Sequence, residues 1–211
     1  MNEGLTTPVY RSFFERSSDD VAFDLVGSWL VLHDGARSTR VLIVETEAYG
    51  GSDDPASHAF RGPTKRNEIM FGPAGYLYVY LIYGMHWCMN VVTGPSGDAS
   101  AVLLRAGVLY EPTSKGDEAE SGALRGPGNL TRGLGITGAD NGLDCCGGNG
   151  RYLTFHQSRQ LSWPTRPSKR IGITREVDRP SRYFLEGHRA VSKTPARHSS
   201  PRPPDKNIPS V

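Results

Sequence analysis

Residues 76–93 contain two apolar runs that are separated only by a short, glycine-containing connection. The runs are Tyr76–Ile82 and Trp87–Thr93, and residues 83–86 join them. Aromatic and β-branched residues on both sides of a connection of this length are typical of a β-hairpin. The segment therefore predicts two antiparallel strands, and it favours a fold that is built from hairpins.

The rest of the chain predicts further strands and only short helices. Strands are expected where β-branched and apolar residues concentrate, over residues 40–48, 101–106, 152–155 and 183–185. Helices are expected over residues 10–16, from 17 to about 30, and over 129–136. Loops are expected over residues 50–75 (with one helical turn at 67–71), 112–123 and 138–150. Because strands outnumber helices, we predict an α+β fold: one domain with a curved, mainly antiparallel β-sheet surrounded by short helices.

The charge of the chain is unevenly distributed. Residues 157–211 carry 12 Lys/Arg against 4 Asp/Glu, whereas residues 1–156 carry 12 against 18. A basic C-terminal quarter is typical of proteins that bind polyanions, although many solvated tails have the same composition. From about Ser192 onward Pro, Ser, Lys and Arg dominate without periodicity. We therefore predict a domain over residues 1–190 and a basic, Pro-rich, disordered tail over 191–211.

Several classes of protein are disfavoured by what the sequence lacks. No apolar run approaches the roughly 20 residues that cross a bilayer, and the first residues do not open a signal peptide. The three cysteines form no CxxC pair, so neither a disulfide framework nor a zinc site is expected. Free thiols favour a cytoplasmic location. Phosphate-binding glycine loops and a Gly-x-Ser-x-Gly elbow are also missing, and we predict no metal and no cofactor.

Two glutamates stand on the strand predicted over residues 40–48. Glu45 and Glu47 are two residues apart, so their side chains share one face of the strand with Tyr49. A carboxylate among apolar neighbours is costly unless it is paired or needed for function. Either both glutamates mark the solvent end of the strand, or one of them pairs with a nearby arginine, or the carboxylate serves a function. Arg105 ends another apolar strand, and it either holds such a carboxylate ionised or reaches solvent.

Aromatic and histidine side chains give two further candidates. His58 lies in the long loop, where a lone histidine is usually a surface residue. Tyr76, Tyr78 and Tyr80 alternate along one strand, which favours an aromatic ladder in the core for the first two. Tyr83 is at the tip of the predicted hairpin and is harder to bury there. It is a candidate for a wedge that enters a base stack.

These segments together resemble the alkyladenine (3-methyladenine) DNA glycosylase family, over roughly residues 5–190. The matching motifs are Val44-Glu-Thr-Glu-Ala-Tyr49, Tyr78-Val-Tyr-Leu-Ile-Tyr-Gly-Met85, Cys88-Met-Asn-Val91, Val102-Leu-Leu-Arg105, Gly126-Pro-Gly-Asn-Leu130 and Arg170-Ile-Gly-Ile173. They occur in the order and at spacings compatible with the family. The resemblance implies an enzyme that flips a damaged purine out of duplex DNA and hydrolyses its glycosidic bond, leaving an abasic site.

The resemblance also assigns roles to individual residues. It makes Glu47 the general base, with Arg105 and the main-chain carbonyl of Ile171 orienting the attacking water. It gives the flipped base one wall from Tyr49 and an opposite wall from Tyr80 and His58. Asn90 would refuse the amino group of guanine, Tyr83 would fill the gap that the flipped nucleotide leaves, and Met85 would lie beside it in the minor groove. The hairpin would then protrude and insert into DNA.

The implied enzyme is a monomer that acts on double-stranded DNA containing damaged purines and is associated with the nucleoid. None of the five lysines lies in the matched motifs, so a Schiff-base intermediate is not expected. Two other functions compete with this one. A non-catalytic nucleic-acid-binding module would use the same aromatic face and basic tail, and a carbohydrate-active hydrolase would use Glu45 and Glu47 as its acid pair.

Overall fold

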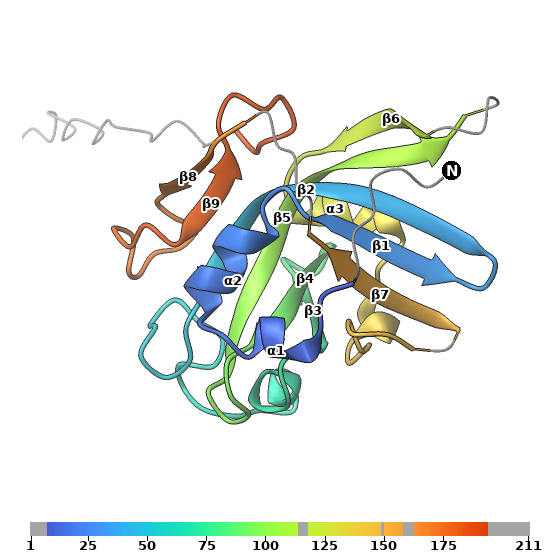
Figure 1. The fold of residues 1–211 in the computed structure, drawn as a ribbon. Helices are drawn as coiled ribbons and strands as arrows, with labels where there is room; N and C mark the ends of the chain where they lie inside the picture. Colours follow the sequence, from blue (N-terminus) through green and yellow to red (C-terminus); the bar gives the residue numbers. More distant parts are fainter. Residues whose placement is uncertain (1–7, 114–117, 149, 158–162, 194–211) are drawn as a thin grey trace, which may run out of the picture.

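The fold was determined as a computed structural model, which describes residues 8–113, 118–148, 150–157 and 163–193. The described residues form more strands than helices, and the helices are short (Figure 1). In chain order they are α1 (Arg11–Phe14), α2 (Ser18–Leu25), β1 (Trp29–Asp34), β2 (Arg37–Tyr49), the 3-10 helix η1 (Glu68–Phe71), β3 (Leu77–Ile82), β4 (His86–Thr93), β5 (Ser100–Pro112), β6 (Glu118–Leu124), α3 (Pro127–Leu134), the 3-10 helix η2 (Gly138–Asp140), β7 (Arg151–His156), β8 (Thr165–Ser168) and β9 (Arg182–Leu185).

The strands form one curled, antiparallel sheet. The main path runs in the order β3-β4-β5-β2-β1-β7, while β6 pairs with β5 and β9 pairs with both β2 and β8. Every strand pair is antiparallel. The predicted α+β class with a curved antiparallel sheet is confirmed. Among the described residues, no helix has the length and apolar character needed to span a membrane.

The main core lies between this sheet and the helices. In Figure 1, α2 lies across the strands β2 and β5, against which it packs. Side chains from the three α-helices and from strands β1, β2, β3, β4, β5 and β7 meet in one buried cluster that includes Leu25, Leu30, Val41, Ile43, Met89, Leu104 and Leu130. Burying apolar surface of this kind is the main favourable term in folding, so the cluster stabilises the sheet on which the site is built.

Helix α2 is shorter than the sequence predicts. Its start agrees with the expected capping residue, because the Ser17 hydroxyl accepts a hydrogen bond from the backbone N–H of Asp20 at 3.2 Å. The expected end near Leu30 is wrong, since the helix stops at Leu25 and Gly27 takes a positive φ of 84°. Leu30 belongs instead to β1, where it pairs with Val41. The apolar residues after Gly27 gain more stability from pairing in the sheet than they would from another turn of helix.

Residues 112–123 also differ from expectation. The segment predicted as an exposed loop contains most of β6, which pairs with the second half of β5. Residues 119–121 of β6 are exposed, and polar, charged residues are common on edge strands because they discourage further pairing. Strand β8 was not predicted either: it contains Pro167, and among the described strands it pairs with β9 alone. The predicted tail falls mostly on residues 194–211, which lie outside the described residues.

Candidate active site

Two irregularities in the pairing of β2 with β5 decide where the candidate catalytic residues point. The register passes from Ile43–Gly107 to Glu45–Ala106 and then to Thr46–Leu104, so Val44 and Arg105 have no partner across the pair. A β-bulge re-aims the side chains that follow it. Before the bulge Ile43 faces the main core; after it, Thr46 and Ala48 face that side. Glu45, Glu47 and Tyr49 therefore share the opposite face.

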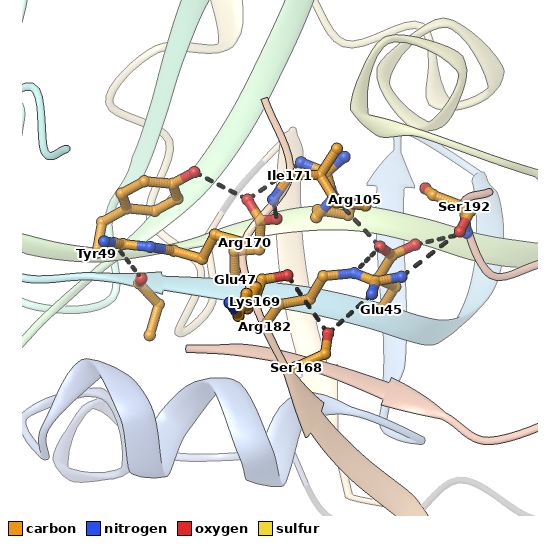
Figure 2. A network of polar contacts seen from close by, with 11 residues as sticks. Glu45, Glu47, Tyr49, Arg105, Ser168, Lys169, Arg170, Ile171, Arg182 and Ser192 are labelled. Carbon is orange, nitrogen blue, oxygen red and sulfur yellow. Dashed lines mark hydrogen bonds and ion pairs between the residues drawn. The ribbon is translucent and has the colours of Figure 1, made fainter. Parts of the chain in front are cut away.

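Glu47 is fully buried and is held by hydrogen bonds from three separate segments. Its Oε2 accepts from the Tyr49 hydroxyl at 2.8 Å and from Nη1 of Arg105 at 3.1 Å. Its Oε1 accepts from the backbone N–H of Ile171 at 2.7 Å. Figure 2 shows these donors around the carboxylate. A carboxylate has about four lone-pair positions. Three of these positions accept hydrogen bonds from donors among the described residues.

The surroundings of Glu47 change its affinity for a proton. Burial raises the pKa of its carboxyl above the ordinary value of 4.5, and the charge of nearby Glu45 adds to this. The Arg105 guanidinium and the donors from Ile171 and Tyr49 oppose the increase without cancelling it. The pKa of the Tyr49 hydroxyl is also raised, first by burial and then by the Glu47 charge, so this tyrosine stays a donor. A carboxylate of raised pKa that keeps its charge is suited to general-base catalysis.

Arg105 joins this carboxylate to a second one. Its Nε donates to Oε1 of Glu45 at 3.3 Å, and the same oxygen accepts from Nε of Arg182 at 2.6 Å. The backbone N–H of Ser192 donates to the other Glu45 oxygen at 2.7 Å. Figure 2 shows Arg105 between the two glutamates. Both glutamates are completely buried, so the reading in which they mark the solvent end of a strand is wrong, as is an Arg105 that reaches solvent.

A cavity of about 470 Å³ opens beside this network. That volume is within the range of small-molecule sites. Six of the residues expected at the site line it: Tyr49, His58, Tyr80, Asn90, Arg105 and Ile171. Tyr83, at the hairpin tip, also contributes to its wall. Glu47 does not line the cavity itself but lies directly behind the residues that do, and three lining residues donate hydrogen bonds to it.

One side of the cavity is aromatic. The rings of Tyr78 and Tyr80 stack at 5.5 Å, and His58 meets Tyr80 edge-on at 4.4 Å. A ring nitrogen of His58 lies 3.1 Å from the Tyr78 hydroxyl, which ties the long loop to β3. Burial, aided by the charge of Arg66, lowers the pKa of His58, so its ring is neutral near pH 7. Tyr76 lies just before β3, and its ring meets the guanidinium of Arg11, 4.9 Å from the ring centroid, rather than this aromatic group.

Asn90 also lines this cavity. It is buried on β4, where it pairs with Tyr78 of β3, and its amide donates to the Tyr78 carbonyl at 3.1 Å. A buried amide that is fixed by a backbone hydrogen bond cannot turn away from a ligand at little cost. The sequence reasoning placed Asn90 among the base-contacting residues, and the structure places it among the lining residues.

The turn between β3 and β4 presents two apolar side chains to solvent. Tyr83 is 79% exposed and Met85 is 71% exposed. The N–H of Met85 donates to the carbonyl of Ile82 at 3.1 Å, and both residues between them have positive φ, 53° for Tyr83 and 67° for Gly84. Glycine adopts this backbone conformation freely, whereas an aromatic residue is strained in it. A bulky side chain that is exposed on a strained turn does not stabilise the fold, which indicates a functional role for Tyr83.

Comparison with known proteins agrees with this geometry. A family model described as methylpurine-DNA glycosylase matches residues 12–189. The chain belongs to this family. It is 44% identical over 188 residues to a protein of Carboxydothermus hydrogenoformans, an alignment that covers 87% of this chain and 97% of that protein. It is 47% identical over 195 residues to a protein of Anaeromyxobacter sp., covering 88% and 92%. Both relatives carry the name "Putative 3-methyladenine DNA glycosylase".

The structure of this methylpurine-DNA glycosylase family member also contains site residues that sequence reasoning missed. Arg182 neutralises Glu45, and a buried pair of Asp54 and Arg170 lies behind Tyr49. Arg170 stands in a motif that carried the resemblance, but that motif assigned no role to its side chain. Asp54 follows two glycines and another aspartate in a loop, a setting that is usual for solvated residues. Only burial in the structure distinguishes Asp54 and Arg170 from ordinary solvated charges.

The contact at Ile171 differs in detail from expectation. The resemblance pointed to the carbonyl of this residue, whereas the contact with Glu47 is made by its N–H. A bond from the carbonyl to a water molecule stays a prediction. Within the described residues no group of three or more His, Cys, Asp or Glu is placed to hold a metal ion. All three cysteines are free thiols.

Proposed function

We propose that this protein is a monofunctional DNA glycosylase that removes alkylated adenine, hypoxanthine or a similar damaged purine and leaves an abasic site. One observation supports this above the others. A buried glutamate of raised pKa lies behind an aromatic cavity, and every segment that holds the glutamate also lines that cavity. The family assignment supports a glycosylase acting on DNA. The choice of damaged purines and the flipping step are part of the proposal.

The proposed reaction is hydrolysis with Glu47 as the general base. As the bond between C1′ and the purine nitrogen breaks, its electron pair leaves with the base and the sugar gains oxocarbenium character. The oxygen of a water molecule forms the new bond to C1′, and Glu47 accepts a proton from that water. Arg105 keeps the carboxylate charged until then, and the negative charge stabilises the developing cation.

The cavity would hold the flipped purine between aromatic walls. Extruding a base costs a few kcal/mol, less when a lesion has already weakened its pairing. Stacking on Tyr49, Tyr80 and His58 would offset part of this cost, at about 1–3 kcal/mol per stacked base. Tyr83 would enter the gap in the duplex, with Met85 beside it. Asn90, which lines the cavity and is fixed by its hydrogen bond, would clash with the amino group of guanine.

Hydrolysis is favoured over a covalent mechanism by the composition of the cavity. A Schiff base with the sugar needs an amine nucleophile. In the part of the chain that the structure describes, the lining residues include no lysine. A glycosidase of the two-carboxylate kind is also disfavoured, because Glu45 is bound by Arg105, Arg182 and Ser192, and of these three donors only Arg105 lines the cavity.

The substitution Glu47→Gln tests the proposal. The amide keeps the size of the side chain but cannot accept the water proton, so single-turnover release of base should fall by at least about 10²-fold. Binding to lesion-containing duplex should be retained. The measurement is chromatography of bases released from methyladenine-, hypoxanthine- and ethenoadenine-containing duplexes, with no metal or cofactor added.

Asp140→Asn is the matched control for this substitution. Asp140 is a buried acid that is paired with Arg151 and does not line the cavity. The control should release base at the wild-type rate. Near-normal excision by Glu47→Gln would remove the assigned base, and an inactive wild-type protein that still binds DNA would favour a non-catalytic binding module.

A further inference from the structure

Arg170 and Asp54 form an ion pair that has no contact with solvent. Both side chains are completely buried, and the guanidinium binds the carboxylate through two parallel bonds, Nη1 to Oδ2 at 2.5 Å and Nη2 to Oδ1 at 3.0 Å. Nη1 also donates to the carbonyl of Ala48 at 3.0 Å. Breaking or removing such a pair is costly, but apolar residues of similar volume often replace it without loss of stability. Stability alone therefore does not explain this ion pair, whereas the geometry that it imposes on its neighbours can.

Asp54 organises the loop that follows β2. Its carboxylate accepts hydrogen bonds from the backbone N–H of Gly50 and of Ala56, both at 3.0 Å. The next residues of this loop, 55–58, all line the cavity and end with His58. Burial alone would raise the pKa of the Asp54 carboxyl. The bonds from Arg170 and from the loop amides outweigh burial and lower it, so the carboxylate is charged at neutral pH.

Arg170 acts on two other walls of the cavity. Its guanidinium lies over the ring of Tyr49, 4.6 Å from the ring centroid. The residue that follows it, Ile171, donates its backbone N–H to Glu47 and lines the cavity. Figure 2 shows Arg170 between Tyr49 and the chain segment after β8 that carries Ile171. One buried arginine thus touches the base wall and anchors a donor to the general base.

We propose that Arg170 and Asp54 are a positioning pair for the active site. The pair fixes the loop of His58, the ring of Tyr49 and the N–H of Ile171 relative to Glu47, so that the base pocket and the general base are assembled together. This inference rests on the proposed glycosylase function and deepens it. Neither residue contacts the reacting atoms in this account, and the pair acts through the residues that it holds.

The chemistry of the two side chains explains why an arginine is used. A guanidinium is planar, so it can bind a carboxylate with two bonds and stack on an aromatic ring at the same time. An ammonium carries the same charge without this geometry. Arg170→Lys should therefore keep the ion pair and lose the alignment, whereas Asp54→Asn should lose the charge of the carboxylate and keep its size.

The test is single-turnover release of ethenoadenine from a duplex, measured at a temperature at which circular dichroism shows each variant folded. A misplacement of about 1 Å in an active site can cost on the order of 10²-fold in rate. We expect a loss of that size for Asp54→Asn and a smaller loss for Arg170→Lys. The double variant Arg170→Met/Asp54→Asn should be only slightly slower than the slower of the two single variants. Ethenoadenine fluorescence should be less quenched in the variants, because Tyr49 stacks on the base less well.

A second measurement separates positioning from simple destabilisation. If Ile171 and Tyr49 move away from Glu47, two influences that lower its pKa weaken, and the acidic limb of the rate profile should move to higher pH. The other titratable or charged groups that act on Glu47 are unchanged in Asp54→Asn: Arg105 of β5, Glu45 of β2, Tyr80 of β3, Cys88 of β4 and Arg170 itself. The control Asp140→Asn should show the wild-type rate and limb even if it unfolds earlier.

The outcomes are distinct. A wild-type rate, quench and acidic limb in Asp54→Asn would overturn the inference and leave the proposed function intact. An equal loss in Asp140→Asn would also overturn it, because the effect would then follow from stability alone. If Asp54→Asn does not fold, Arg170→Lys decides by the same three readouts. Absence of base release from the wild-type protein would refute the proposed function itself.

Discussion

Glu47 combines two properties that are rarely found together in one carboxyl group. It is completely buried, and its pKa is raised by that burial, yet three hydrogen bonds hold its charged form. A folded-state pKa above the unfolded one means that ionising the group costs folding free energy as the pH rises through this interval. Such a cost is common at active sites, where a tuned proton acceptor is needed at the expense of stability.

This tuning predicts the pH dependence of the reaction. Because only ionised Glu47 can accept the water proton, the rate should fall on the acidic side, through a limb that lies above the ordinary glutamate pKa of 4.5. The pKa of Asp54 is lowered below 3.8, so the pair with Arg170 stays charged across this limb. Single-turnover rates between about pH 4 and 9 measure the limb, and the residual rate of Glu47→Gln should lack it. A limb at or below 4.5 would contradict the prediction.

At the scale of secondary-structure elements, bulges and turns determine which side chains the sheet directs toward the site and toward solvent. The two register shifts between β2 and β5 turn Glu45 and Glu47 away from the main core, and the turn after β3 holds Tyr83 in the left-handed region. The sequence indicates the hairpin correctly because apolar alternation and a glycine are local signals. It does not show the bulges, since a bulge is defined by the partner strand.

The strained turn predicts that a substitution of Tyr83 can raise the stability of the protein and at the same time impair its function. Tyr83→Asn places a residue that tolerates positive φ at this position, so the free energy of unfolding should rise by about 1 kcal/mol. The same change removes the wedge, so base flipping should be impaired more than non-specific DNA binding. Denaturant unfolding and a fluorescent base analogue in duplex measure the two effects. Met85→Ala is the comparison, because Met85 is also exposed beside the turn but does not have a positive φ. Unchanged flipping in Tyr83→Asn would count against the wedge.

For the molecule as a whole, the contact at Ser192 determines where a truncation should be made. Its N–H binds Glu45, so a truncated protein should keep this residue, and residues 194–211 can be deleted without removing that contact. The deleted segment carries Arg197, Arg202 and Lys206 against Asp205.

Deletion after Lys193 should leave the single-turnover rate on saturating DNA unchanged and weaken non-specific binding. Each lost phosphate contact should reduce the salt slope by about 0.9, so the slope should fall by up to about 3. A salt titration of duplex binding measures this. Full-length protein with the three basic residues changed to Gln is the control for charge. An unchanged slope would show that these charges do not contact DNA, and a reduced rate would mean that the deleted segment supports the site.

The sequence by itself determined the α+β class, the β3–β4 hairpin, the shared face of Glu45 and Glu47, and the family, because alternation, turn residues and motif order are local or linear properties. It did not determine the end of α2, strands β6 and β8, or the partners of the buried charges. Each of these depends on atoms far away in the chain: Arg170 meets Asp54 across 116 positions and Arg182 meets Glu45 across 137. A charged side chain looks the same in sequence whether water or another buried charge solvates it, and only the tertiary structure decides which of the two it meets.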